Sequence, residues 1–148
     1  MRLDAFSKKV AEIVPPIHMA MLKKQPDFIA KTRLTFQQLN LMEALRFLGP
    51  AKMSDLARLL AVTKSAVTGL ADRLIKGKYA RRAHEEGDRR IVRLELTPRG
   101  REFAERMARY RLDMIRGLFS NISERDRSSY LDILLKIKAN IDRESGNK

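Results

Sequence analysis

One stretch of this sequence leaves the three- and four-residue spacing of helices for the two-residue period of a strand. Val92, Leu94 and Leu96 alternate there with charged residues, which is the pattern of a half-buried strand. The polar, glycine-containing residues 85–88 come just before it, and residues 79–84 can supply an antiparallel partner. The pattern therefore predicts a β-hairpin in a chain whose other periodic segments are helical.

Two short helical segments stand directly before the hairpin. Ser54 is the expected N-cap of the first and Thr63 that of the second, because their hydroxyls can accept from backbone N–H groups of the first turn. The apolar face of the second segment is formed by Ala66, Val67, Leu70, Ala71, Leu74 and Ile75. Since the connector is so short, the two helices must cross sharply, which predicts a helix–turn–helix with the hairpin as its wing.

The N-terminal residues predict a helix with one apolar stripe. Its members are spaced by three and four, and they are Leu3, Phe6, Val10, Ile13, Ile17 and Ala20. Pro15 and Pro16 remove two backbone donors. The helix should therefore kink near Val14 or restart with Pro16 in the first turn of a new helix.

Three more helices have marked starts. Thr35 and Gln38 have the spacing of a capping box, and Gly49-Pro50 should end that helix, whose expected apolar face is Leu39, Met42, Leu45 and Leu48. Thr97-Pro98 and Ser123 start the two C-terminal helices. Their apolar faces include Tyr110, Met114, Ile115 and Leu118 in one and Tyr130, Leu131, Leu134, Ile137 and Ile141 in the other. The predicted fold class is mainly α with a small β-hairpin wing.

Charge indicates the class of partner. The chain has 31 Lys and Arg against 18 Asp and Glu, a formal net charge of +13. Such an excess favours a polyanion, with nucleic acid first and an anionic membrane surface second. No apolar run approaches the roughly 20 residues that span a bilayer, so we expect no membrane segment.

Other function classes find little support in the sequence. No Cys is present, which is compatible with the cytoplasm, where we expect the protein. His18 and His84 are too few and too far apart to argue for a metal site, so neither a metal nor a cofactor is expected. The sequence also lacks a phosphate-binding Walker loop, a dinucleotide-binding fingerprint, His-Glu-x-x-His and Gly-x-Ser-x-Gly. We therefore do not expect an enzyme.

A set of short motifs between residues 34 and 100 resembles the MarR family of bacterial transcription regulators. They are Leu34-Thr35 with Gln38, Asp55-Leu56-Ala57, Val67-Thr68 with Asp72-Arg73-Leu74, Asp88-Arg89-Arg90, and Leu96-Thr97 with Gly100. The resemblance implies one MarR-like domain over residues 1–148, with the winged-helix DNA-binding lobe at 34–100. Residues 1–33 and 101–148 would then be dimerisation helices.

The second helix of the helix–turn–helix carries the candidate major-groove contacts. If its apolar face is buried, the residues that face outward are Lys64, Ser65, Thr68, Gly69, Asp72 and Arg73. Lys64 and Ser65 lie in the first turn, where the helix amides favour phosphate, and Thr68 is placed for a base edge. Gly69 either lets the backbone approach DNA closely or is a tolerated surface glycine.

The hairpin carries the candidate minor-groove contact. It holds Arg81, Arg82, Arg89, Arg90 and Arg93. An arginine near the tip can enter a narrow minor groove, where the negative potential is greatest. The resemblance implies that Arg89 or Arg90 does this while Asp88 fixes the wing through a salt bridge. The alternative is a solvated run of charges.

Three features depart from the family pattern. Ala61 stands where many helix–turn–helix motifs have Gly, so the turn should differ slightly. The hairpin tip between Arg82 and Asp88 is one residue longer than expected, which blurs the roles of Arg81 and Arg82. Pro15-Pro16 in the first helix can change the angle between subunits.

The terminal helices carry more apolar surface than one small winged helix can cover. A two-fold homodimer would bury it, although packing within a monomer is the alternative. Dimerisation would place two recognition helices about one DNA turn, roughly 34–36 Å, apart on an inverted repeat.

The family resemblance further implies a small aromatic or anionic effector. Candidate lining residues are Phe6, His18, Met21, Phe36, Met42 and Phe47, with ordinary core packing as the alternative. The predicted function is thus a homodimeric, sequence-specific regulator of double-stranded DNA, acting as a repressor that a ligand can relieve. An architectural or RNA-binding winged helix without a specific operator is the rival.

Overall fold

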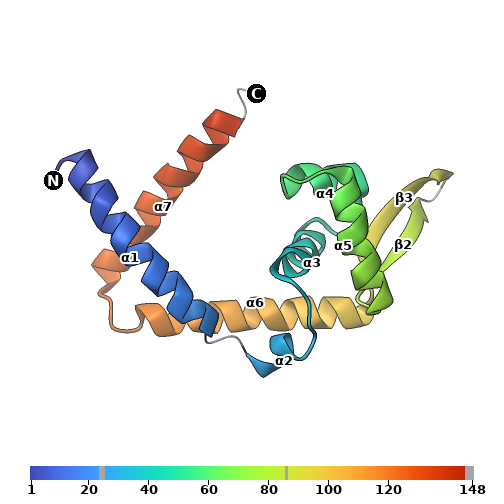
Figure 1. Ribbon diagram of the computed structural model, residues 1–148, viewed down its shortest axis with the longest axis horizontal. Helices are drawn as coiled ribbons and strands as arrows, with labels where there is room; N and C mark the ends of the chain where they lie inside the picture. Colours follow the sequence, from blue (N-terminus) through green and yellow to red (C-terminus); the bar gives the residue numbers. More distant parts are fainter. Residues whose placement is uncertain (24–25, 86, 146–148) are drawn as a thin grey trace. The chain divides into compact units, whose positions relative to one another are not determined.

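The computed structural model describes residues 1–23, 26–85 and 87–145, without the side chains of Leu22, Arg89 and Ser145. These residues divide into two compact units, Met1–Glu105 and Arg106–Lys148. In chain order, the elements are α1 (Leu3–Lys23), α2 (Asp27–Ala30), α3 (Phe36–Leu48), β1 (Ala51–Lys52), α4 (Met53–Leu59), α5 (Lys64–Lys76), β2 (Ala80–Glu85), β3 (Asp88–Leu96), α6 (Pro98–Phe119) and α7 (Glu124–Ser145) (Figure 1). The mainly helical fold with a small wing is confirmed.

The sheet is antiparallel, with strand order β1-β3-β2. The predicted hairpin is present, and Ala80 pairs with Leu96 at its base. The register shifts between His84 and Glu85, close to the tip. Strand β1, which pairs Ala51 with Leu94, was not predicted, because two residues are too short to show a period.

The core of the first unit lies where α3, α4 and α5 meet the sheet. Its largest fully buried side chains are Leu41, Met42, Leu45, Leu56, Val67, Leu74 and Leu94. The buried face of α3 is rotated from the predicted one, since Leu41 is buried and Leu48 is 46% exposed. Gln38 is also buried, because its side chain is used in the cap of its own helix.

Hydroxyl caps fix the starts of α3, α5, α6 and α7 as predicted, with Thr97 as the cap of α6. Thr35 Oγ1 accepts from Gln38 N at 3.3 Å while Gln38 Oε1 accepts from Thr35 N at 2.9 Å, which completes the capping box. Thr63 Oγ1 accepts from Ala66 N at 3.1 Å, and Ser123 Oγ accepts from Asp126 N at 3.1 Å. Each cap satisfies a backbone donor that the first turn leaves without a partner.

Ser54 is not the cap of α4, so that prediction is wrong. The helix already begins at Met53, and Lys52 occupies the cap position without a side-chain hydrogen bond. The reason is strand β1, which pairs Lys52 with Arg93 and so holds Lys52 extended up to the first helical residue. Ser54 therefore lies inside the first turn.

Pro15-Pro16 and Ala61, which depart from the family pattern, do not disrupt the expected elements. Helix α1 runs through Pro15 and Pro16 without interruption, so the alternative of a restarted helix does not occur. In the turn between α4 and α5, Ala61 has φ +52°, the left-handed conformation that Gly adopts most easily. The turn is thus kept despite Ala61, at a cost of about 1–2 kcal/mol.

An aromatic group ties α2 and the start of α6 to the base of the wing. The rings of Phe28 and Phe103 lie 5.6 Å apart, and those of Tyr79 and Phe103 lie 5.3 Å apart. The Arg99 guanidinium lies 4.8 Å from the Tyr79 ring centre. None of the helices in the described part of the chain is long and apolar enough to cross a membrane.

Candidate nucleic-acid interface

Helix α5 divides into a buried face and an outward face much as the sequence predicts. Val67, Ala71 and Leu74 are buried. The candidate contacts Lys64, Ser65, Gly69 and Arg73 are exposed, together with Asp72, and Thr68 is half-buried. Thr68 Oγ1 donates to the Lys64 carbonyl at 2.9 Å, so its hydroxyl presents acceptor lone pairs and its methyl group to the outside.

Gly69 has no role in the packing of the protein. A Cβ added there would meet no atom within 4 Å, and the residue stands in an otherwise regular helix. Glycine costs about 1 kcal/mol relative to alanine in such a place. Since packing does not require a glycine at position 69, two explanations remain. Either the glycine lets the backbone approach DNA closely, or it is a tolerated surface residue.

Replacing Gly69 with alanine should separate these explanations. We expect Tm to rise by roughly 2–4 °C, from the gain in helix propensity, while affinity for DNA falls about tenfold because the methyl group separates the backbone from the groove. Gly117→Ala is the matched control, since its added Cβ also meets open space in a helix. It should raise Tm and leave the affinity for DNA unchanged. If both variants bind DNA equally well, Gly69 is only tolerated.

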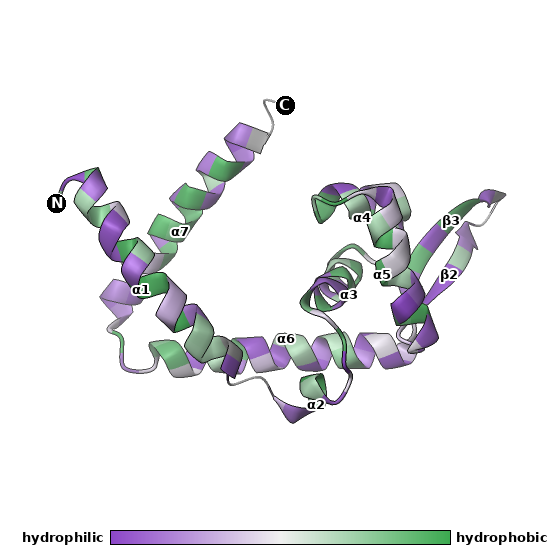
Figure 2. Ribbon diagram, viewed as in Figure 1, coloured by the Kyte–Doolittle hydropathy of each residue, from purple (hydrophilic) through white to green (hydrophobic). Residues whose placement is uncertain are grey.

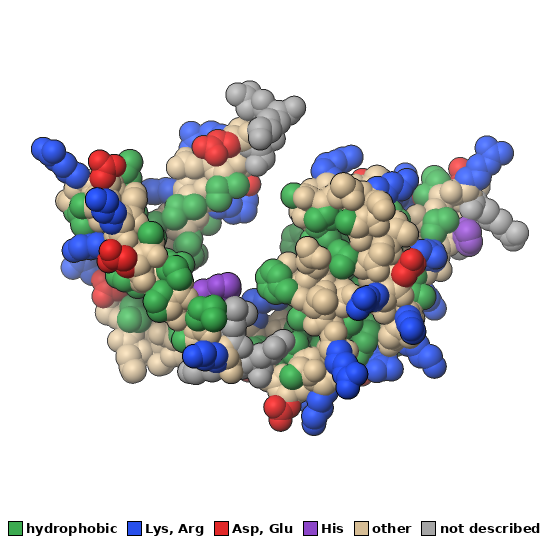
Figure 3. Space-filling model, in the orientation of Figure 1, with side chains coloured by type: hydrophobic (Ala, Val, Ile, Leu, Met, Phe, Trp, Pro, Cys, Tyr) green, Lys and Arg blue, Asp and Glu red, His purple; other side chains and the backbone are tan. Residues whose placement is uncertain are grey.

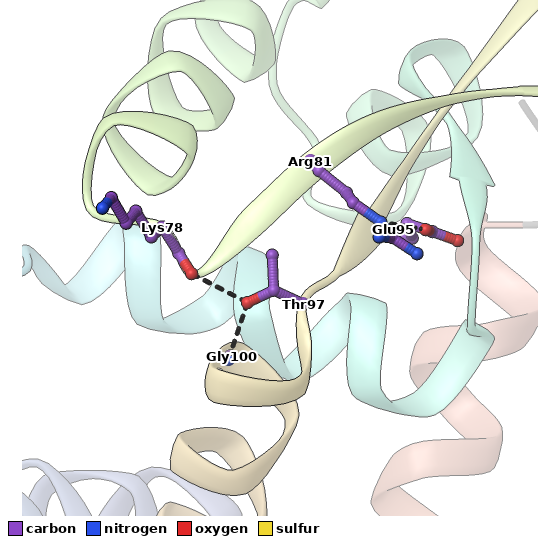
Figure 4. Close-up of polar contacts among 5 residues, drawn as sticks. All are labelled: Lys78, Arg81, Glu95, Thr97 and Gly100. Atoms are coloured by element: carbon purple, nitrogen blue, oxygen red, sulfur yellow. Dashed lines mark hydrogen bonds and ion pairs between the residues drawn. The ribbon is translucent and has the colours of Figure 1, made fainter.

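Three arginines of the wing are tied to carboxylates. Arg81 Nε lies 2.5 Å from Glu95 Oε1, a pair that Figure 4 shows beside the strand, and Arg82 Nη2 lies 2.6 Å from Asp72 Oδ1. Arg93 Nη2 donates to Glu85 Oε1 at 2.9 Å. That hydrogen bond lowers the pKa of Glu85, because it stabilises the ionised carboxylate.

The tip of the wing is different. Asp88 Oδ1 accepts from the Arg90 backbone N at 2.9 Å, so Asp88 positions the tip through the backbone. The Arg90 side chain is exposed, and no carboxylate among the described residues lies within ion-pair distance of it. The Arg89 side chain falls outside the described residues. Arg90 is therefore a cation that the described fold leaves available.

A basic groove lies between α5 and the wing. It has a volume of about 480 Å³, and its lining includes Lys52, Lys64, Thr68, Arg82 and Arg90. Figure 3 shows blue Lys and Arg side chains at several places on the surface of the first unit. Four cations from β1, α5, β2 and β3 thus converge beside the candidate base-reading residue Thr68. Sequence reasoning missed Lys52 and left Arg82 without a role, because both depend on strand pairings.

The residues of the Leu96-Thr97 and Gly100 motif form a junction at the base of the wing. Thr97 Oγ1 accepts from Gly100 N at 3.0 Å and donates to the Lys78 carbonyl at 2.7 Å (Figure 4). Thr97 N donates to the Tyr79 carbonyl at 3.0 Å. A Cβ at Gly100 would lie only 1.8 Å from that carbonyl oxygen. This motif therefore fastens both strands to the start of α6.

The six candidate effector residues differ in their exposure. Met42 is fully buried, whereas Phe36 and Phe47 are 71% and 81% exposed, so one helix presents these three to different sides. Phe6 and His18 are exposed on α1, and Met21 is half-buried. Neither the basic groove nor the apolar groove described below includes any of them. Among the described residues no group of three or more His, Cys, Asp or Glu is placed to hold a metal ion.

Comparison with known proteins agrees with this geometry. Residues 34–91 match the model of the MarR family. Over these residues, which form most of the winged helix, the chain is similar to the MarR family. A relative in Bacillus subtilis, the uncharacterized HTH-type transcriptional regulator YsmB, is 24% identical over 86% of this chain and 88% of its own length. The HTH-type transcriptional repressor MdtR of the same organism is 37% identical over 53% of this chain and 52% of its own.

Solved structures of MarR proteins share the fold. A MarR family protein from Bacillus stearothermophilus superposes with a TM-score of 0.79 at 15% identity, covering 96% of this chain and 99% of that one. Streptococcus pneumoniae FabT, whose structure is in complex with DNA, gives a TM-score of 0.75 at 20% identity, covering 96% of each. These likenesses show that the chain has the fold of MarR proteins.

Proposed function

We propose that this protein is a sequence-specific repressor that binds an inverted-repeat operator as a homodimer. The observation that carries the proposal is the basic groove, where Lys52, Lys64, Arg82 and Arg90 surround Thr68. Cations of this kind neutralise phosphates and fix the register of a protein on DNA, while a residue such as Thr68 can reach a base edge. Lys64, Ser65, Thr68, Gly69 and Arg73 would enter the major groove, and Arg90 or Arg89 the minor groove beside it.

The wing supports this division of roles. Arg81 and Arg93 are held by Glu95 and Glu85 and so keep the hairpin in shape. Arg90 is exposed and is placed at the tip by Asp88. A cation at the end of a braced hairpin is suited to a narrow groove, where the negative potential of DNA is greatest.

Exposed apolar faces support the homodimer. Leu3, Ile13 and Ile17 on α1 and Leu131, Ile137 and Ile141 on α7 are each about half exposed or more. Figure 2 shows hydrophobic residues recurring along both helices. In the second unit an apolar groove of about 520 Å³ is lined chiefly by Ile115, Phe119, Tyr130, Leu131 and Leu134. Apolar surface of this extent marks an interaction site. In a two-fold dimer, the same apolar faces of a second copy of the chain would cover it.

The repressor role rests on relatives. MdtR and YetL of Bacillus subtilis are both named HTH-type transcriptional repressors. A dimer seated on a promoter blocks polymerase simply by occupying the site, in the cytoplasm where the promoter is. Relief by a small aromatic or anionic effector belongs to the proposal through the family resemblance alone. The candidate lining residues for that effector are Phe6, His18, Met21, Phe36, Met42 and Phe47.

Selection from a random pool of DNA duplexes at near-physiological salt, together with the mass of the protein in solution, tests the proposal. We expect the mass of a dimer and an enriched palindrome whose half-sites lie about one helical turn apart. Binding that is salt-sensitive but enriches no sequence would instead support an architectural protein. Preference for RNA or the mass of a monomer would also contradict the proposal.

A further inference from the structure

Asp72 places a negative charge on the outward face of α5, which is the face proposed to contact DNA. It is the one acidic residue of that helix and lies between Gly69 and Arg73 on the side proposed to meet DNA. Its side chain is 57% exposed. A carboxylate on such a surface repels phosphates, since like charges a few ångströms apart raise the energy of the complex. Its presence therefore needs a reason other than affinity.

Asp72 has one strong partner, and that partner lines the basic groove. Asp72 Oδ1 accepts from Arg82 Nη2 at 2.6 Å, which joins the recognition helix α5 to strand β2 of the wing. Arg82 lines the groove together with Lys64, Thr68 and Arg90. The carboxylate thus neutralises one of the four cations that a phosphate would meet there.

Stability does not explain this pair. Both side chains are about half exposed, and ion pairs so open to water contribute little to folding. The Arg81–Glu95 pair differs in its place, because both residues belong to paired strands of one hairpin; Arg81 is 64% exposed and Glu95 is 20% exposed. That pair braces the wing, whereas Asp72–Arg82 connects the two elements that would contact DNA.

We infer that Asp72 is a specificity-determining residue of the proposed DNA interface. By holding Arg82, it keeps this cation from binding a phosphate on DNA of the wrong sequence, and its own charge makes such a complex weaker. A correct site compensates by placing a hydrogen-bond donor opposite the carboxylate. In the major groove that donor is the N4 amino group of cytosine. Specificity is then gained by penalising wrong partners. This inference rests on the proposed function.

Asp72→Asn tests the inference, because asparagine keeps the size of the side chain and removes its charge. Binding is measured at several salt concentrations on the duplex sequence selected by the wild-type protein and on a shuffled duplex of equal length. We expect affinity for the shuffled duplex to rise about fivefold to tenfold and affinity for the selected duplex to rise less or to fall. On the shuffled duplex, the released Arg82 should contact one more phosphate and steepen the salt slope by about 0.9.

Two comparisons separate this role from charge and from folding. Asp142→Asn raises the net charge of the protein by the same amount as Asp72→Asn. Asp142 lies on α7 in a similar ion pair, 2.6 Å from Lys138 Nζ, and its side chain is 60% exposed. This substitution should leave the ratio of the two affinities unchanged. In the double variant Asp72→Asn with Arg82→Ala, the gain in salt slope should disappear. Tm should stay close to that of the wild type for Asp72→Asn, because the pair stabilises the fold little.

The possible results are distinct. If the wild type prefers its selected sequence and Asp72→Asn keeps the same ratio of affinities, the inference is wrong and the proposed function stands. The inference also fails if Asp72→Asn and Asp142→Asn strengthen binding to both duplexes equally, since net charge would then be the cause. If the wild type itself has no preference, the proposed function fails first.

Discussion

Replacing Gly100 with alanine should destabilise the protein by about 3 kcal/mol and lower Tm by roughly 6–12 °C. The added methyl carbon would lie 1.8 Å from the Tyr79 carbonyl oxygen, far inside van der Waals contact. Backbone surrounds this point, because Thr97 N already donates to the same oxygen and Thr97 Oγ1 caps the Gly100 amide. The first turn of α6 must therefore shift, and at least one of these hydrogen bonds must be lost.

Thermal unfolding at one fixed protein concentration measures this effect. Gly117→Ala is the control in the same helix, and it should raise Tm because its added Cβ meets no neighbour. A Gly100→Ala variant as stable as the wild type would show that α6 withdraws from Tyr79 at no cost. The junction at Thr97 would then not be rigid.

Replacing Arg90 with alanine should weaken binding to the selected operator by about 10- to 100-fold without a change in Tm or in oligomeric state. The loss should be large because the side chain is exposed, lies on a tip fixed by Asp88, and has no carboxylate partner among the described residues. Since no described ion pair holds this arginine, we expect its removal to leave the wing intact.

Titration of a labelled operator duplex measures the loss. Arg125→Ala removes the same charge from an exposed position in the first turn of α7, outside the residues proposed to contact DNA, and it should change affinity by less than about threefold because salt screens exposed charges. Equal losses for both variants would mean that net charge alone acts. Affinity unchanged by Arg90→Ala would assign the minor groove to Arg89 or to neither arginine.

Local patterns predicted most of the fold, and contacts across the chain account for what was missed. The capping hydroxyls of Thr35, Thr63 and Ser123 act within four residues, so spacing alone identifies them. Strand β1 exists only because Ala51 meets Leu94, far along the chain, and this pairing also explains why Ser54 is not a cap. Short strands carry no period of their own, and no local rule reveals them.

In the candidate interface, too, local patterns predicted some residues, and contacts across the chain determine the others. The outward face of α5, with Lys64 and Thr68, follows from helical periodicity once the apolar side is known to be buried. Lys52 and Arg82 enter the groove through the sheet, and the Asp72–Arg82 pair joins residues of two different elements. Phe36 and Phe47 were predicted as pocket residues because aromatic side chains at helical spacing resemble a lining. Their exposure depends on which way α3 turns, which sequence does not specify closely.

The junction at Thr97 has a mechanical consequence. Its side chain and amide hold the carbonyls of Lys78 and Tyr79 just before β2, and Thr97 itself directly follows β3 and caps α6. No flexible linker separates the start of β2, the end of β3 and the start of α6 at this junction. We therefore expect a rotation of the first turn of α6 to move β2 and β3 together. The displacement should be largest at the hairpin tip, which is the part of the two strands farthest from Thr97.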